Sequence, residues 1–181
     1  MPEPELVNAV GGGDLEEEIN LEVLSQELDG EVVRYNPINW PGLYFRQNME
    51  SPVILIFRTG KYNITGASSI DELFQTNDEF IEKLHNKGIS VPTSSFELRN
   101  IVFLNQFDSE LDLDKTCIAL GLDKTEYEPE QFPGIMYHPA EVDGVFLIFR
   151  NGKVIFTGAK SHEHADEAYN NLFTMLNSML T

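Results

Sequence analysis

Residues 127–161 read YEPEQFPGIMYHPAEVDGVFLIFRNGKVIFTGAKS, and residues 35–69 read YNPINWPGLYFRQNMESPVILIFRTGKYNITGASS. The two stretches align without a gap, and Tyr127 follows Tyr35 by the same 92 positions that separate Gly158 from Gly66. A match of this length is an internal repeat rather than a short shared motif. The chain is therefore built from two versions of one unit.

The repeat continues upstream, where Asn100 matches Asn8 and Val102 matches Val10. It fills nearly all of the 181 residues, and we predict residues 1–92 as the first repeat and residues 93–181 as the second. Two copies are too few for a solenoid, which needs about three or more repeats for stability. We expect one pseudo-two-fold body with a shared sheet and core.

The composition is strongly acidic. The chain has 30 acidic and 12 basic residues, a net charge of −18 and a pI near 4.4, and charge alone argues against a nucleic-acid binder. Acidity spread along the whole chain is, however, typical of a protein from a high-salt cytoplasm, where a Debye length of ~3 Å or less screens repulsion from DNA. The alternative is an ordinary acidic binding module that never meets DNA.

Other features of the composition point to a globular intracellular protein. A hydrophobic content of 41 % is enough for a packed core. The single cysteine, Cys117, excludes an internal disulfide framework and lies in an apolar helical pattern that places it in the core. No apolar run reaches the ~18 residues that a membrane span needs, and the N-terminus lacks a basic signal region. We expect a cytoplasmic location.

Hydrophobic periodicity and turn residues predict the elements of each repeat. Asn20 and Ser69 are expected to begin two helices of the first repeat, and the three glycines at 11–13 are expected to interrupt its first strand. The predicted fold class is α+β, a curved ten-stranded antiparallel sheet with helices on one face. Expected strands are 6–10, 32–35, 43–46, 53–57, 61–65, 96–104, 125–127, 135–137, 145–149 and 154–157; expected helices are 21–28, 70–87, 113–120 and 162–180; residues 91–95 are the expected linker.

The face of the sheet without helices is expected to be apolar, because both sides of strands such as 145–149 carry apolar residues. Monomers seldom expose such a surface without a partner. Dimerisation, another domain and a ligand remain open as ways to cover it. Repeat-related amides and hydroxyls beside apolar side chains favour the minor groove of A·T pairs, which offers only hydrogen-bond acceptors. The predicted base contacts are Asn8, Val10, Leu55, Thr65, Asn100, Val102, Leu147 and Thr157.

The tract EYEPEQFPG, followed by LIFR, GK and TGAKS, resembles the TATA-box-binding protein family in its archaeal form. The resemblance covers nearly the whole chain. It implies a saddle-shaped sheet with helices on the convex face, and a general initiation factor that binds and kinks TATA-box promoter DNA. It also implies recruitment of transcription factor B and RNA polymerase, with nucleoid association in an archaeon, and neither a cofactor nor enzymatic activity.

The resemblance assigns further site residues. Two aromatic pairs match the family's intercalating phenylalanines, whereas Phe146 and Phe156 are expected in the core. Basic residues in or beside the repeated strands would hold phosphates. The loop of Glu128, Pro129, Glu130 and Gln131 corresponds to the stirrup that transcription factor B contacts. The intercalating pairs are Trp40 with Phe57 and Phe132 with Phe149; the phosphate contacts are Arg46, Arg58, Lys61, Arg150, Lys153 and Lys160.

Four residues depart from the family pattern. Trp40 replaces a phenylalanine, Asn63 a valine that faces the bases, Ser68 a lysine and His138 an arginine. These departures indicate a divergent paralogue, from a halophile given the acidity, with altered promoter preference or weaker bending.

Two other functions remain open. One is a TATA-binding-protein-like module that bends DNA weakly or not at all and acts through protein contacts. The other is an accessory substrate-binding domain of a nucleic-acid enzyme. A metal site at His162 and His164 is disfavoured, because their i, i+2 spacing does not place both rings on one face of a helix.

Overall fold

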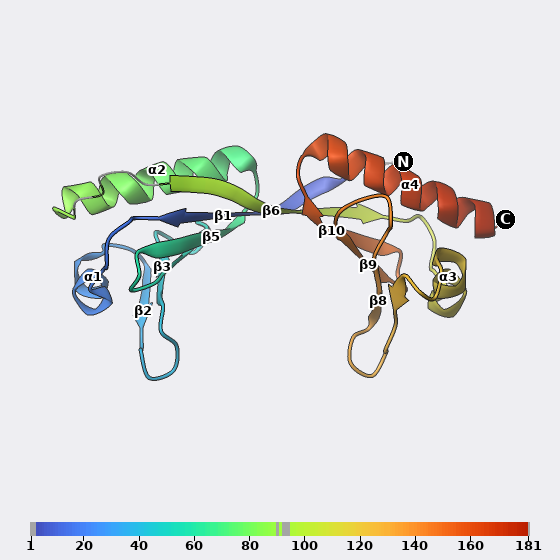
Figure 1. The fold of residues 1–181 in the computed structure, drawn as a ribbon, viewed down its shortest axis with the longest axis horizontal. Helices are drawn as coiled ribbons and strands as arrows, with labels where there is room; N and C mark the ends of the chain where they lie inside the picture. The colour runs from blue at the N-terminus through green and yellow to red at the C-terminus, as the bar shows by residue number, and fades with distance from the viewer. Residues whose placement is uncertain (1–2, 90, 92–94, 181) are drawn as a thin grey trace. The chain divides into compact units, whose positions relative to one another are not determined.

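The protein is described by a computed structural model that covers residues 3–89, 91 and 95–180, with ten strands and four helices in that part of the chain (Figure 1). The predicted linker therefore lies largely outside the described residues. The predicted α+β class is confirmed. The elements are β1 (Glu5–Asp14), α1 (Leu21–Glu27), β2 (Val32–Tyr35), β3 (Leu43–Arg46), β4 (Val53–Ile56), β5 (Lys61–Ala67), α2 (Ile70–Asn86), β6 (Ser95–Gln106), α3 (Leu113–Leu120), β7 (Thr125–Glu126), β8 (Gly134–Tyr137), β9 (Val145–Phe149), β10 (Lys153–Ala159) and α4 (His162–Leu180).

The ten strands follow the order β2-β3-β4-β5-β1-β6-β10-β9-β8-β7 in one sheet. Neighbours such as β4 and β5, or β9 and β10, pair antiparallel, as the repeated hairpins predict. The chain forms two compact units. One is Asn8–Arg99, and the other runs from Asn100 onward and includes the start of the chain up to Val7. Each unit is described below by itself.

Side-chain caps explain where the helices begin. The Asn20 side chain accepts a hydrogen bond from the Val23 N–H at 3.2 Å, and the Ser69 hydroxyl accepts one from Glu72 at 3.0 Å. Each cap satisfies a backbone donor that the first turn of a helix leaves without a partner. Both predicted helix starts are thus confirmed.

The prediction that the glycines at 11–13 interrupt the first strand was wrong. β1 continues to Asp14, with Gly11 opposite Ile64 of β5. A Cβ atom on Gly11 would lie 2.3 Å from the ring of Phe96, so the missing side chain makes room for that ring. The repeat counterpart of Gly11 is Phe103, which is fully buried. In the first unit, Phe96 thus supplies the aromatic bulk that Phe103 supplies in the second.

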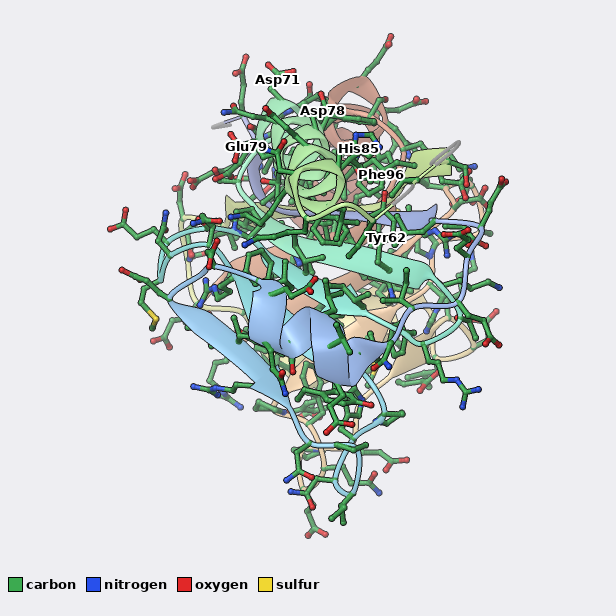
Figure 2. All side chains as sticks on the ribbon, turned by 90° about the vertical axis from the view of Figure 1, so that its left-hand side faces the viewer. Tyr62, Asp71, Asp78, Glu79, His85 and Phe96 are labelled. Atoms are coloured by element: carbon green, nitrogen blue, oxygen red, sulfur yellow. The ribbon has the colours of Figure 1, made fainter. Side chains whose placement is uncertain are left out.

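In the unit Asn8–Arg99, α2 covers one face of the strands with an apolar stripe. Leu73, Phe80 and Leu84 of α2 are all buried. The ring of Phe96 stacks on Tyr62 at 5.9 Å between centroids. Figure 2 shows both rings beside the inner side of α2, whereas acidic side chains of the helix point away. The burial is the main favourable contribution to this unit's stability.

The second unit has an equivalent core beneath α4. Tyr169 and Phe173 of the helix are buried against the strands, together with Phe146 and Phe156. The predictions that Phe146 and Phe156 belong to the core are therefore confirmed. Cys117 is also buried, as its helical pattern predicts.

Each unit contains a polar contact between its long helix and its strands. The tyrosine that makes the contact lies on a strand in the first unit and on the helix in the second. In the first unit, the Tyr62 hydroxyl on β5 donates to Asn77 Oδ1 on α2 at 2.6 Å. In the second, the hydroxyl of Tyr169, the repeat counterpart of Asn77, lies 2.9 Å from the carbonyl oxygens of Phe103 and Val154. Either arrangement satisfies a polar group that burial would otherwise leave unpaired.

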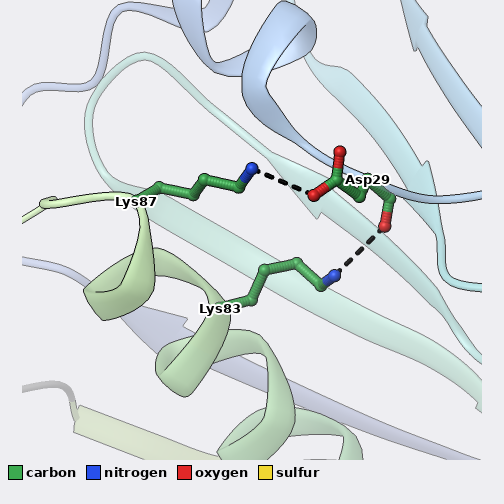
Figure 3. A network of polar contacts seen from close by, with 3 residues as sticks. All are labelled: Asp29, Lys83 and Lys87. Carbon is green, nitrogen blue, oxygen red and sulfur yellow. Dashed lines mark hydrogen bonds and ion pairs between the residues drawn. The ribbon is translucent and has the colours of Figure 1, made fainter.

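The C-terminal end of α2 makes two additional polar contacts in the first unit (Figure 3). Lys83 Nζ donates to the backbone oxygen of Asp29 at 3.1 Å, and Lys87 Nζ lies 2.9 Å from Asp29 Oδ2. The hydrogen bond from Lys87 holds the pKa of Asp29 below its usual value. Cations at this end of a helix also favour its dipole. Gly121 is the counterpart of Asp29 and has no carboxylate, so the second repeat cannot form this ion pair.

The buried Tyr62 predicts a loss of stability in alkali. Burial raises its pKa to about 12, so above pH 10 the unfolded chain loses this proton more readily than the folded chain. The free energy of unfolding should therefore fall between about pH 10 and 12, by up to ~1.4 kcal/mol per pH unit for this group. Urea unfolding of Tyr62→Phe should show a shallower fall, with half-exposed Tyr127→Phe as the control. An equal slope in Tyr62→Phe and the parent protein would contradict this.

Candidate nucleic-acid interface

Each unit leaves one face of its strands without a helix. Along β4 and β5, Ile54, Ile56 and Ile64 are buried, whereas the alternating Leu55 and Thr65 are half-exposed. We call the half-exposed side the open face. The structure places every predicted base contact at a half-exposed position on this face: Asn8, Val10, Leu55 and Thr65 in one unit, and Asn100, Val102, Leu147 and Thr157 in the other.

The strand register brings the apolar and hydroxyl groups of the open face together. Thr157 stands opposite Val102 of β6 and Val145 of β9, and Leu147 stands opposite Ile155. Directly opposed residues of an antiparallel pair project to the same face, about 5 Å apart. Val145 and Ile155 therefore also belong to the open face. Sequence reasoning had not included them, although strand pairing makes them neighbours of the predicted contacts.

The two repeat-related asparagines are held in a fixed orientation. The Gly66 N–H donates to Asn8 Oδ1 at 2.8 Å, and the Gly158 N–H donates to Asn100 Oδ1 at 2.9 Å. Both glycines have positive φ, 88° and 95°, at irregularities in the strand register. Because glycine adopts this conformation without strain, its N–H can turn toward the asparagine.

These hydrogen bonds decide which part of each amide is presented outward. With Oδ1 occupied, an approaching ligand meets the Nδ2 group, which is a donor. Asn100 Nδ2 also lies 3.1 Å from Thr157 Oγ1, so the threonine accepts and its hydroxyl hydrogen can point elsewhere. The open face thus offers donors surrounded by apolar side chains, which suits a ligand that carries acceptors.

The four predicted intercalating residues form two matching pairs. The rings of Trp40 and Phe57 lie 5.6 Å apart at 68°, and those of Phe132 and Phe149 lie 5.6 Å apart at 62°. All four are partly exposed, with Trp40 at 40 %. Edge-to-face pairs of this kind are stable without full burial, so the rings can contact an outside partner.

The loops that carry Trp40 and Phe132 have the same backbone turn. The Trp40 N–H donates to the Asn36 oxygen at 3.0 Å, and the Phe132 N–H donates to the Glu128 oxygen at 2.9 Å. A Cβ atom on Gly42 would lie 2.4 Å from the Trp40 ring, so the missing side chain lets the ring lie over the start of β3. The two loops therefore position their aromatic residues in the same way.

Two of the six predicted phosphate contacts are paired with carboxylates. Lys160 Nζ lies 2.8 Å from Asp143 Oδ2, and Arg58 lies 3.9 Å from Glu18. The hydrogen bond from Lys160 holds the pKa of Asp143 below its usual value. Exposed ion pairs contribute little, about 0–1 kcal/mol, so a phosphate could replace either carboxylate. The other four are Arg46, Lys61, Arg150 and Lys153, of which Arg46 donates to the Ser51 oxygen at 2.9 Å.

The predicted partner loop is exposed at Glu128, Pro129, Glu130 and Gln131. In the first repeat, the counterpart of Glu130 is Ile38, which is 92 % exposed. The two loop tips therefore share a backbone turn but differ in chemistry.

Other candidate sites have structural explanations. The His162 ring packs edge-on against Phe103 at 4.7 Å, and His164 Nδ1 accepts from the Lys160 N–H at 3.1 Å. Among the residues that the structure describes, no group of three potential ligands could hold a metal ion. Over the same residues, no helix is long and apolar enough to cross a membrane.

Comparison with known proteins agrees with this architecture. The family model described as transcription factor TFIID, or TATA-binding protein, matches residues 3–87 and again 95–179. TATA-box-binding protein C of Halobacterium salinarum is 42 % identical over 167 residues, covering 91 % of this chain and 92 % of that protein. The TATA-box-binding protein of Haloarcula marismortui is 36 % identical over 176 residues, covering 97 % and 94 %. The solved structure of Methanococcus jannaschii TBP aligns with a TM-score of 0.81 at 36 % identity, covering 98 % of this chain and 99 % of that one.

A double-repeat fold with an open apolar face, matched twice by one family model, defines a DNA-binding transcription factor rather than an enzyme. The chain belongs to the TATA-binding protein family.

Proposed function

We propose that the chain binds A·T-rich promoter DNA of the TATA-box type in the minor groove, through the open faces of its two units. The orientation of Asn8 and Asn100 carries the proposal. Their Oδ1 atoms accept backbone hydrogen bonds, which leaves the Nδ2 groups as donors for a ligand, although Asn100 Nδ2 also donates to Thr157 Oγ1. The minor groove of A·T pairs presents only the acceptors adenine N3 and thymine O2. Donors set among apolar side chains therefore match A·T pairs, whereas most of this surface would leave a guanine amino group without a partner.

The aromatic pairs add a mechanical step. Rings that are held by a loop turn and remain partly exposed can enter between base pairs and kink the duplex toward the major groove. Unstacking costs a few kcal/mol per step, which the contacts of the bent groove offset. The six basic side chains then contact phosphates on both strands, with Arg58 and Lys160 exchanging a carboxylate for a phosphate.

The same proposal includes protein partners. The exposed loop with Glu128 and Glu130 is the surface for transcription factor B, and RNA polymerase joins through that complex. Carboxylates at a loop tip attract a basic surface and fix its register. The first-repeat loop has the apolar Ile38 at the position of Glu130, so only the second-repeat loop offers this charge.

A second candidate function rests on the departures in the first repeat. Trp40 is bulkier than the phenylalanine of the second repeat, and Asn63 places an amide on an otherwise apolar part of the open face. A paralogue with weak or no bending would act mainly through its protein contacts. Binding without bending would favour this candidate.

Asn100→Asp tests the donor assignment with little change in shape. The carboxylate still accepts from the Gly158 N–H, but it offers no donor and repels the groove acceptors. We expect the affinity for an A·T-rich duplex in molar KCl to fall about tenfold or more, measured by fluorescence anisotropy. Asn170→Asp makes the same charge change at an exposed position of α4 and should leave the affinity nearly unchanged. Equal losses in the two variants would contradict the assignment.

The partner loop can be tested separately from DNA binding. Replacing both Glu128 and Glu130 by Gln should lower the affinity of transcription factor B for the protein–DNA complex about tenfold, because two charges at its contact are lost. Binary DNA affinity should stay the same. A variant with Glu163→Gln and Glu167→Gln on α4 removes equal charge elsewhere and serves as the control. Unchanged recruitment by the loop variant in a gel-shift titration would exclude this loop as the contact.

A further inference from the structure

The open faces of the two units differ at one set of repeat-related positions. In the second repeat, Leu147 stands opposite Ile155, and Ile155 stands opposite Leu104, which gives an apolar row across three strands. The equivalent row in the first repeat is Leu55, Asn63 and Gly12. The first repeat therefore replaces a branched apolar side chain by an amide, and a leucine by no side chain.

The Asn63 amide is half-exposed and lies beside the apolar Leu55. Within the described part of the chain, no hydrogen bond is formed by its side chain. Asn8 and Asn100 differ in this respect, because the backbone occupies their Oδ1 atoms. Asn63 can therefore both donate and accept, and its Oδ1 is an acceptor that the second repeat lacks at this position.

The amide borders a hollow into which the Arg99 side chain reaches. A hollow of about 840 Å³ opens here, lined in part by Gly12, Gly13, Asn63, Phe57 and Arg99. A Cβ atom on Gly12 would lie 2.3 Å from Arg99 Nε, and Gly12 projects to the same face as its pairing partner Asn63. The Arg99 guanidinium thus occupies the open face above Gly12, with Glu97 3.5 Å away.

An amide acceptor with space beside it changes which base pairs fit. G·C differs from A·T in the minor groove by the guanine N2 amino group, a donor that clashes with, or is desolvated by, an apolar surface. Leu104 and Ile155 present such a surface. Asn63 Oδ1 can instead accept a hydrogen bond from the amino group, and the hollow beside Asn63 gives that group room.

We propose that the first repeat accepts a G·C pair in its half of the DNA site, whereas the second repeat requires A·T. This inference rests on the proposed function and adds that the preferred site is asymmetric. It makes Asn63 a specificity-determining residue. A site with one G·C pair is then bound in the orientation that places this pair under the first repeat.

Three duplexes test the proposal by fluorescence anisotropy: an A·T-only site with mirror-symmetric halves, the same site with one G·C pair, and a third with G·C at both mirror-related positions. The position is chosen by scanning each pair of the half-site in turn. For the parent protein, one G·C pair should weaken binding less than about threefold. The duplex with two G·C pairs should bind about tenfold more weakly than the duplex with one. Inosine·cytosine pairs, which lack the amino group, should abolish the loss.

Two repeat-exchanging variants make the test specific. For Asn63→Val, the first G·C pair should weaken binding about tenfold relative to the same variant's affinity for the A·T-only duplex. Ile155→Asn should reduce the loss that the second G·C pair causes, with Ile155→Val as its control. Both positions lie on the open face, and urea unfolding checks that each variant is folded.

The outcomes separate this inference from the proposed function. If no duplex is preferred over a fully G·C sequence, the proposed function itself fails. If the A·T-only duplex is preferred but a single G·C pair at every scanned position costs the parent tenfold, the asymmetry is wrong. The same holds if Asn63→Val leaves the tolerance unchanged.

Discussion

In each unit, a long helix covers only one face of the strands. The other features of the structure depend on this constraint. α2 and α4 bury the aromatic and aliphatic side chains of their own units, and one polar contact fixes each helix to its strands, through Tyr62 or Tyr169. The opposite face keeps its apolar side chains half-exposed. Exposed apolar surfaces of this kind mark interaction sites. The proposed role of the Nδ2 donors of Asn8 and Asn100 favours a ligand that carries acceptors.

The charge of the chain is distributed in agreement with this contrast between the helix-covered face and the open face. The acidic side chains of Asp71, Asp78 and Glu79 point away from the strands on the outer side of α2 (Figure 2). The open face contains amides, hydroxyls and apolar groups, and basic residues lie in or beside its strands. A net charge of −18 therefore need not oppose a DNA contact at high salt, because a Debye length of ~3 Å screens charges on the outer surface.

The sequence was sufficient to predict the helices and strands, the repeat and the open face. Hydrophobic periodicity and capping residues depend only on residues near in sequence, and the 92-residue offset is found by aligning the chain with itself. It failed where a side chain from another strand decides the outcome. The three glycines of β1 looked like an interruption, and only Phe96 and Arg99 show why they are needed. The burial of the polar Asn77 could not be predicted, since it depends on the hydroxyl of Tyr62. The fixed orientation of Asn8 likewise depends on the positive φ of Gly66.

If the two aromatic pairs wedge the minor groove as proposed, the bend can be measured by fluorescence transfer between the ends of a doubly labelled A·T-rich duplex in molar KCl. Transfer should rise when the protein binds. Phe132→Ala combined with Phe149→Ala should bind with much less transfer, whereas removing an exposed aromatic of α2 by Phe74→Ala should leave the transfer unchanged. Saturable binding by the parent protein with no change in transfer would contradict the account.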